Sequence, residues 1–317
     1  MNSLEQLKRF TTVVVDSGDF EAAQKYLPQD ATTNPSLILA AAKLPAYHHL
    51  LNDAVAYSKS QGGDAALALD RLIVLFGVEY LKLIPGRVST EIDARLSYHT
   101  QDTVEKARRL IKMYEELGVD KKRILVKIAS TWEGIQAARI LEAEGIHCNL
   151  TLLFSLTQAA TCAEAGATLI SPFVGRILDW HLRRTGQQSF APSADPGVQS
   201  AKEIYCYLKR FGYHTIVMGA SFRNVEEIIE LAGIDYLTIS PKLMEELTQM
   251  DRRIERKLTC DKCEHEHKLT KMSLIDDEGL FRSKLQADEM ASELLADGIR
   301  RFDQDAQSLQ AQLQALF

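Results

Sequence analysis

The sequence predicts an α/β fold, a (β/α)8 TIM barrel with additional helices in its N-terminal half and at its C-terminus. Short apolar runs rich in Val, Ile and Leu recur along the 317 residues. Most of these runs are followed by a stretch of helical period that ends near a Gly or Pro. Such alternation is typical of repeated βα units, and eight of them with short loops close naturally into a barrel of parallel strands.

The expected strands share an apolar or β-branched composition. They are 13–17, 29–33, 88–93, 124–130, 147–153, 168–173, 214–221 and 236–240. Between them lie amphipathic segments that each close on a Gly, which is a common helix stop. These segments are 103–118, 132–145, 156–166, 201–212 and 224–233.

Three further segments go beyond a bare barrel. Two long helical stretches, around 46–60 and 64–82, precede the third strand. The helical period of 284–317 predicts one or two helices that pack on the barrel wall or against a second subunit. We therefore expect a single barrel domain over residues 1–317, with 242–317 as a C-terminal helical extension.

Composition and charge exclude several classes of protein. A net charge of −6 argues against a general nucleic-acid-binding surface, which needs a clustered basic face. The N-terminus lacks the layout of a signal peptide, and no apolar run is long enough to cross a membrane. The five cysteines form an odd set, as expected where thiols stay reduced. The sequence thus predicts a cytoplasmic protein without nucleic-acid or membrane partners and without a structural disulfide.

Polar residues that end the predicted strands are the candidates for chemistry. In a βα barrel the reactive groups lie where the strands reach the C-terminal face, so these side chains should converge on one mouth. The candidates, in chain order, are Asp16, Thr33, Asn34, Glu91, Lys127, Asn149, Thr151, Ser171 and Ser221.

Lys127 is the most informative of them. It lies in the strand ILVKIAS, whose composition predicts burial on both faces. Period-two alternation sends Lys127 into the lumen if Val126 and Ile128 face the helices. Desolvation there favours the neutral amine, the nucleophile that forms an imine with a ketone. An isolated lysine near a strand end more often extends to water, but the polar neighbourhood favours the chemical role here.

Two carboxyl groups and two arginines complete the set. Asp16 and Glu91 can supply the proton transfers that imine chemistry needs, although either carboxyl alone would more often be a cap or a surface pair. Arg176 and Arg223, with the Ser221 hydroxyl, are candidates for a phosphate clamp, because barrel enzymes often bind phosphate at the late loops. The alternative is that both arginines are simply exposed at helix starts.

These residues lie in longer strings that resemble the transaldolase family, from the N-terminus to about residue 258. The strings are TTVVVDSGDF, QDATTNPSLIL, LIPGRVSTEIDARLSYHT, RILVKIASTWEGI, CNLTLLFS, LISPFVGRILDW and VMGASFRN. The resemblance implies a barrel enzyme of the non-oxidative pentose phosphate pathway. Such an enzyme moves a dihydroxyacetone unit from sedoheptulose 7-phosphate to glyceraldehyde 3-phosphate, giving erythrose 4-phosphate and fructose 6-phosphate.

The resemblance also implies a role for each matching position. It makes Lys127 the imine lysine, Asp16 the acid and base, and Glu91 with Thr151 a proton relay through water. Contacts to the substrate are implied at Thr33, Asn34, Asn149, Ser171, Phe173, Arg176, Ser221 and Arg223. It further implies a homodimer that needs no cofactor, since the lysine itself supplies the electrophile.

Two other functions stay open on the sequence alone. One is a simple aldolase of the same fold, which releases the three-carbon fragment instead of transferring it. The other is a phosphosugar-binding barrel without turnover, because fold alone does not fix function.

The segment 259–285 does not match the family pattern. In it Cys260, Cys263, His265 and His267 form C-x-x-C-x-H-x-H, which could offer zinc two thiolates and two imidazoles. All four fall within eight residues, tighter than the usual two-pair spacing, so a polar surface loop or hairpin is the favoured interpretation and no metal is expected.

Overall fold

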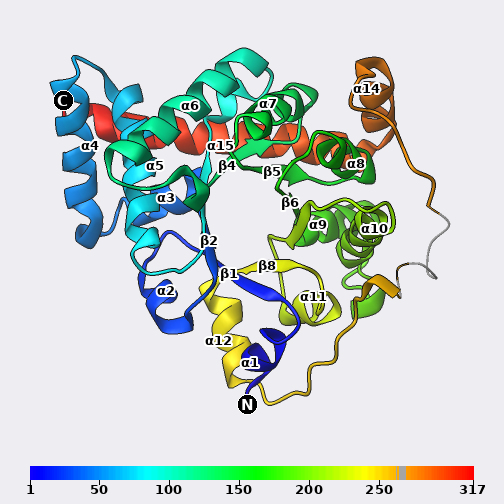
Figure 1. The fold of residues 1–317 in the computed structure, drawn as a ribbon. Helices are drawn as coiled ribbons and strands as arrows, with labels where there is room; N and C mark the ends of the chain where they lie inside the picture. The colour runs from blue at the N-terminus through cyan, green and yellow to red at the C-terminus, as the bar shows by residue number, and fades with distance from the viewer. Residues whose placement is uncertain (262, 264–268) are drawn as a thin grey trace.

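A closed barrel of eight parallel strands forms the centre of the protein (Figure 1). The computed structural model describes residues 1–261, 263 and 269–317. The strands are β1 (Thr12–Asp16), β2 (Asp30–Thr32), β3 (Val88–Glu91), β4 (Ile124–Ala129), β5 (Cys148–Leu153), β6 (Leu169–Pro172), β7 (Ile216–Gly219) and β8 (Tyr236–Ile239). Each predicted strand overlaps one of these, and the predicted (β/α)8 barrel is confirmed.

The helices that surround the strands follow the predicted pattern. They are α1 (Ser3–Leu7), α2 (Glu21–Tyr26), α3 (Pro35–Ala41), α4 (His48–Ser60), α5 (Ala65–Leu81), α6 (Thr100–Glu116), α7 (Trp132–Ala143), α8 (Leu156–Glu164), α9 (Val174–Thr185), α10 (Pro196–Arg210), α11 (Val225–Glu230), α12 (Pro241–Gln249), α14 (Glu278–Ala287) and α15 (Glu289–Gln314). Short 3-10 turns η1 (Pro45–Tyr47), η2 (Ala94–Leu96), η3 (Lys121–Arg123) and η4 (Pro192–Ala194) join some of them. The predicted glycine stop after α6 is confirmed, because Gly118 has a φ of +78°, which disfavours other residues.

Two helices differ from the expected segments for local reasons. Helix α10 begins before residue 201, because Asp195 caps it and Pro196 occupies its first turn. Helix α9 was not among the predicted helices, since its first residues continue the apolar run of β6. Its start places Arg176 in the first turn of a helix.

The strand β4 is buried on both faces and alternates as predicted. Val126 and Ile128 belong to the large core between strands and helices. Leu125 packs instead in a small cluster inside the barrel, with residues of β1, β6 and β7. Lys127, two residues further on, therefore points into the lumen as well.

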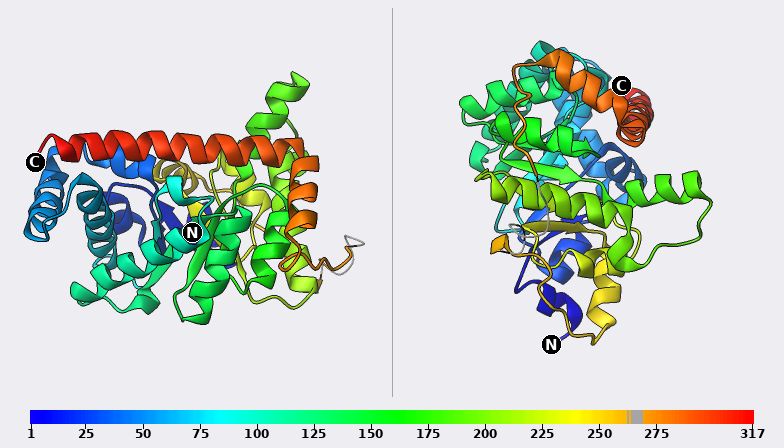
Figure 2. Two further views of the ribbon diagram at one scale, coloured as in Figure 1. Left: turned by 90° about the horizontal axis from the view of Figure 1, so that it is seen from above. Right: turned by 90° about the vertical axis from the view of Figure 1, so that its right-hand side faces the viewer.

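The C-terminal helix α15 lies across one end of the barrel. It contacts α3, η2, β5 and α9, and the helical elements among these follow the carboxyl ends of strands. Figure 2 shows this helix, in red, running along the length of the molecule. The predicted helices in 284–317 are confirmed, but α15 extends over the mouth rather than only along the barrel wall.

A disulfide joins Cys206 of α10 to Cys263, so the expectation of no disulfide is wrong. No local pattern indicated this pair, because the two cysteines are 57 residues apart and lie in different elements. Cys148, Cys162 and Cys260 are free. Within the described residues, no three His, Cys, Asp or Glu side chains form a group that could hold a metal ion. His265 and His267 lie outside the described residues.

None of the helices that the structure describes is long and apolar enough to span a bilayer.

Candidate active site at the barrel mouth

The side chain of Lys127 lies inside the barrel and is only 4% exposed. Its Nζ donates a hydrogen bond to the carbonyl oxygen of Thr33 at 3.1 Å and lies 3.0 Å from Oε2 of Glu91. The strand register explains this proximity, because Lys127 pairs with Glu91 of β3 on one side and with Asn149 of β5 on the other. Three polar side chains thus stand at one level of the lumen.

Two buried carboxyl groups flank the amine. Burial raises the pKa of Glu91, and the nearby charge of Lys127 opposes this increase. Burial likewise raises the pKa of Asp16, again against the charge of Lys127 and a hydrogen bond from Thr32. Both carboxyls can therefore exchange protons closer to neutral pH than exposed carboxyls do.

Thr32 and Thr238 hold Asp16 in place. The Thr32 hydroxyl donates to Oδ1 of Asp16 at 3.0 Å and lies 2.6 Å from the Thr238 hydroxyl. Sequence reasoning missed both threonines, although Thr32 pairs in register with Asp16 and an alternation argument could have found it. Thr238 had no comparable signal, because its strand is more than 200 residues away in the chain.

A chain of hydrogen bonds crosses the floor of the site. Ser171 donates to Oδ1 of Asn149 at 2.6 Å, and Nδ2 of Asn149 donates to the Ser89 hydroxyl at 3.0 Å. These bonds fix the Asn149 amide between two strands. In the described part of the chain, Oγ1 of the buried Thr151 has no hydrogen-bond partner, which leaves this hydroxyl free to bind a small polar molecule.

Thr33 and Asn34 lie at the junction of β2 and α3. The Thr33 side chain is buried and its hydroxyl donates to the carbonyl of Ser89 at 3.2 Å, so only its backbone carbonyl faces the amine. Asn34 caps α3 by accepting a hydrogen bond from the Leu37 amide at 2.9 Å, and it lines the cavity around Lys127. The structure therefore brings Asn34, but not the Thr33 hydroxyl, to the cavity.

Aromatic rings form the wall of the same cavity. Phe173 is 6% exposed and packs edge-on against Phe154, with ring centroids 5.7 Å apart. The Arg176 guanidinium lies between two rings, 5.0 Å from the centroid of Phe173 and 5.4 Å from that of Phe302. Phe302 belongs to α15 and was missed, because no local pattern shows that a C-terminal helix reaches the mouth.

Positive charges gather beside this wall. Burial lowers the pKa of Arg176, and the charges of Arg301 and Arg223 lower it further. Ser221 lines the cavity with Arg176. Arg223 does not line it in this structure, since its guanidinium is bound to Asp179 at 2.8 and 3.0 Å. It still reaches the carbonyl of Ser221 at 3.0 Å, so it lies at the edge of the site.

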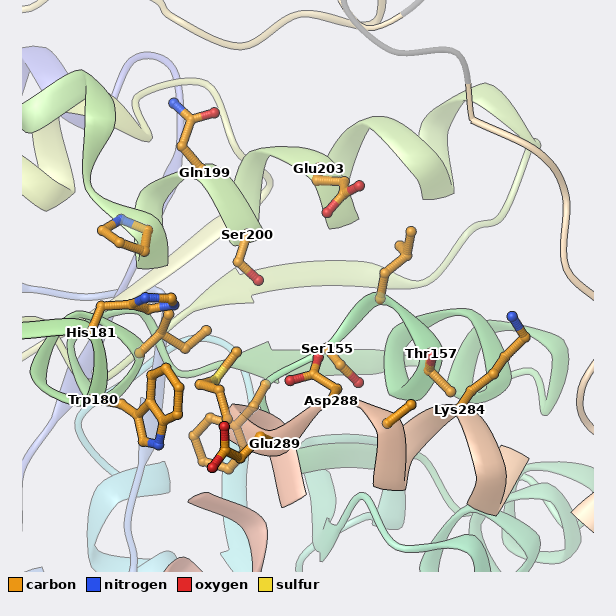
Figure 3. Close-up of a pocket in the computed structure, with 16 residues that line it drawn as sticks. Ser155, Thr157, Trp180, His181, Gln199, Ser200, Glu203, Lys284, Asp288 and Glu289 are labelled. Carbon is orange, nitrogen blue, oxygen red and sulfur yellow. The ribbon is translucent and has the colours of Figure 1, made fainter. Parts of the chain in front are cut away.

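A wide, open pocket elsewhere has a different character. It lies between α8, α9, α10, α14 and the start of α15, and Figure 3 shows Trp180, His181, Glu203, Lys284 and Asp288 among the residues that line it. Its lining contains none of the sequence-predicted site residues that the structure describes. The chemistry of the predicted residues therefore belongs to the barrel mouth and not to this pocket.

Comparison with known proteins agrees with the geometry. Residues 13–313 match the family model described as Transaldolase/Fructose-6-phosphate aldolase. The chain is 57% identical to a transaldolase of Rattus norvegicus over 98% of this chain and 93% of that protein. It is 56% identical to transaldolases of Edwardsiella ictaluri and Schizosaccharomyces pombe, over 99% of this chain and 99% of the relative in each case. The chain belongs to the transaldolase/fructose-6-phosphate aldolase family.

Proposed function

We propose that this protein is a transaldolase, a transferase of the pentose phosphate pathway. It moves a dihydroxyacetone unit from sedoheptulose 7-phosphate to glyceraldehyde 3-phosphate and gives erythrose 4-phosphate and fructose 6-phosphate. The observation that carries the proposal is a buried lysine amine 3.0 Å from a buried carboxyl group at the mouth of a parallel barrel. Relatives of more than half identity over nearly the whole chain support it.

The reaction begins with imine formation at Lys127. Nζ attacks the ketose carbonyl carbon, and the resulting hydroxyl leaves as water after it gains a proton. Glu91 is the proton donor and acceptor for this step, since it lies beside the amine and its pKa is raised by burial. The unpartnered hydroxyl of Thr151 supports a role in holding the water molecule that relays the proton.

Carbon–carbon cleavage then depends on Asp16. Its carboxylate removes the proton of the sugar hydroxyl next to the bond that breaks, and the imine accepts the electron pair. The first aldehyde leaves, and an enamine remains on Lys127. Attack by the enamine on the acceptor aldehyde, with return of the proton from Asp16, reverses these steps and forms the product ketose.

Side chains on the floor of the site hold the three-carbon unit. Asn34 and Ser171 line the cavity around Lys127. Asn149, which pairs in register with Lys127, is fixed by its hydrogen bond with Ser171. We propose that they bind the ketol hydroxyls. Thr33 contributes through its backbone carbonyl, which accepts from Lys127.

Transfer rather than release requires that the enamine is not protonated while it waits for the second aldehyde. The buried Phe173 ring supports this, because an apolar wall excludes water from the carbanion face.

The substrate phosphate is proposed to bind at Arg176, Ser221 and Arg223. The convergence of arginine charges on Arg176 favours an anion there. Arg223 would exchange its contact with Asp179 for the phosphate, because an ion pair that is about 40% exposed on each side is only weakly held.

The dimeric assembly rests on the family resemblance alone. We propose a cytoplasmic homodimer in which residues 1–317 form one domain and 242–317 are its helical extension. The packing of α15 on α3 and α5 supports the single domain, since the extension and the N-terminal half share a core.

A coupled assay tests the function. Transaldolase activity requires that fructose 6-phosphate is consumed only when an acceptor aldehyde is present and that a new ketose phosphate forms in equal amount. Release of free dihydroxyacetone without an acceptor would instead identify a simple aldolase. No turnover under either condition, together with tight binding of fructose 6-phosphate, would identify a binding protein.

A further inference from the structure

The loop after β7 carries Ser221 and Arg223. Two sets of hydrogen bonds, one from α9 and one from α11, hold its backbone in place. On one side the amide of Gly175 in α9 donates to the carbonyl of Ser221 at 3.1 Å. A Cβ at Gly175 would stand 2.3 Å from that oxygen, so the approach is too close for another residue. Ser221 itself has a φ of +62°, a conformation that a serine holds only when its surroundings enforce it.

The second clamp is Glu227 of α11. Its Oε2 accepts hydrogen bonds from the backbone amides of Arg223 at 2.5 Å and Asn224 at 3.3 Å. The Asn224 side chain returns the contact by accepting from the amide of Glu227, which forms a capping box. The position of Arg223 therefore depends on the carboxyl group of Glu227.

A second buried carboxyl group, that of Asp195, lies beside Glu227. Oε1 of Glu227 is buried and has no hydrogen-bond partner in the described part of the protein. The Asp195 side chain lies within hydrogen-bonding reach of the Glu227 carboxyl group, and both residues line the same cavity. Oδ1 of Asp195 caps α10 by accepting from the amides of Gly197 at 2.8 Å and Val198 at 3.2 Å. Glu227 is 1% and Asp195 4% exposed.

A single proton on the pair removes the repulsion between the two carboxyl groups. Two buried carboxylates in contact repel each other, whereas a proton on Glu227 turns its unpartnered oxygen into a donor toward Asp195. The electrostatics agree, because burial and the charge of Asp195 raise the pKa of Glu227 to about 7.

We propose that Glu227 and Asp195 share a proton, and that this acid pair is a positioning device that holds Ser221 and Arg223 in the geometry that binds the substrate phosphate. The inference rests on the proposed function and adds a pH control to its phosphate site. Loss of the shared proton separates the two carboxylates, moves the Glu227 side chain away from the amide of Arg223 and weakens the binding of phosphorylated substrates.

Charged side chains near Glu227 and Asp195 also affect how readily the pair holds its proton. The Arg223 guanidinium favours the Glu227 anion, and His181 of α9 favours the Asp195 anion when it is protonated. Burial lowers the pKa of His181, so this effect fades as the pH approaches neutrality. Asp179 lines the same cavity and pairs with the Arg223 guanidinium at 2.8 Å.

The test compares the KM for glyceraldehyde 3-phosphate with the KM for unphosphorylated glyceraldehyde between about pH 6.5 and about pH 8.5. In the wild-type enzyme the first KM should rise on the order of fivefold while kcat and the second KM stay nearly constant. Glu227→Gln imitates the protonated acid, so its KM for the phosphate should stay low across the range. Glu227→Ala removes the clamp, and its KM should be high at every pH.

Glu226→Gln is the matched control. Glu226 is the preceding residue on α11, is partly exposed and pairs with Arg252, so its substitution removes the same charge without touching the Arg223 amide. It should keep the wild-type pH dependence. Asp195→Asn is a second variant in case Glu227→Gln folds poorly, because asparagine still caps α10 and its amide can donate to Glu227. It should also flatten the pH dependence.

The proposal is overturned if Glu227→Gln and Asp195→Asn keep the wild-type rise in KM, or if the unphosphorylated acceptor shows the same rise. A wild-type protein without any transfer activity would contradict the proposed function instead. In that case the dissociation constant for fructose 6-phosphate, measured by calorimetry over the same pH range in the wild type and Glu227→Gln, decides the inference alone.

Discussion

The amine of Lys127 and the carboxyl group of Glu91 form a contact of 3.0 Å in which both side chains are at most 7% exposed. Buried charges are costly unless they are paired, so neither residue is placed there for packing alone. The pair puts a nucleophile and a proton donor within reach of one substrate atom. This relationship is the basis of the proposed imine mechanism.

Removing the acid should slow the reaction without removing the nucleophile. We expect Glu91→Gln to lower kcat by about 10² to 10⁴, the usual range for a general acid or base. Because burial raises the pKa of Glu91, wild-type kcat should also begin to fall on acidification at a higher pH than an exposed glutamate would produce. Steady-state assays across the acid range measure both effects.

Glu105→Gln provides the control for this experiment. Glu105 is an exposed residue of α6, and its Oε1 accepts a hydrogen bond from Gln101 at 3.1 Å. Its substitution should leave kcat unchanged. An unchanged kcat in Glu91→Gln would remove Glu91 from the mechanism.

The aromatic wall should control the balance between transfer and release. Phe173→Tyr adds a hydroxyl that can hold a water molecule or donate a proton beside the enamine. We expect a higher rate of dihydroxyacetone release relative to transfer, measured by running the assay with and without an acceptor. Phe154→Leu changes the partner ring of Phe173 without adding a polar group, and it should not favour release in the same way. An unchanged ratio in Phe173→Tyr would count against a dry wall.

The disulfide between Cys206 and Cys263 should contribute to stability. It closes a segment with a separation of 57 residues, and the chain-entropy model assigns such a loop about 4 kcal/mol. Urea unfolding with and without dithiothreitol should show this difference in the wild type. Cys206→Ser should be less stable and indifferent to the reductant.

Cys260→Ser is the appropriate control, because Cys260 is a free and exposed cysteine close to the same bridge in sequence. It should respond to dithiothreitol as the wild type does. A wild-type protein whose unfolding free energy is independent of reductant would show that the bridge adds nothing in solution.

The fold could be predicted because its signals are local. Most βα units carry their own apolar run, amphipathic stretch and closing glycine, as β4, α7 and Gly145 do, and parallel strands then have few ways to assemble. The position of Lys127 followed from the same logic, since alternation within one strand decides which residues enter the lumen.

What the sequence did not reveal depends on contacts between distant segments. Phe302 reaches the mouth only because α15 crosses it, and Cys263 meets Cys206 only because the segment after α12 passes α10. The unpartnered oxygen of Glu227 lies where α11 meets Asp195, the cap of α10. Neither hydrophobic periodicity nor composition predicts contacts between distant segments, so these contacts are seen only in the folded structure.

The most direct test of the central claim is reduction with borohydride in the presence of fructose 6-phosphate. Peptide mass analysis should find a three-carbon adduct on Lys127, and Lys127→Met should lose both the adduct and the activity while it remains folded. Lys8, whose pKa is lowered by burial and whose amine donates to the carbonyl of Tyr26 outside the barrel mouth, serves as the internal control and should stay unmodified. An adduct on another lysine, or an active Lys127→Met protein, would contradict the mechanism.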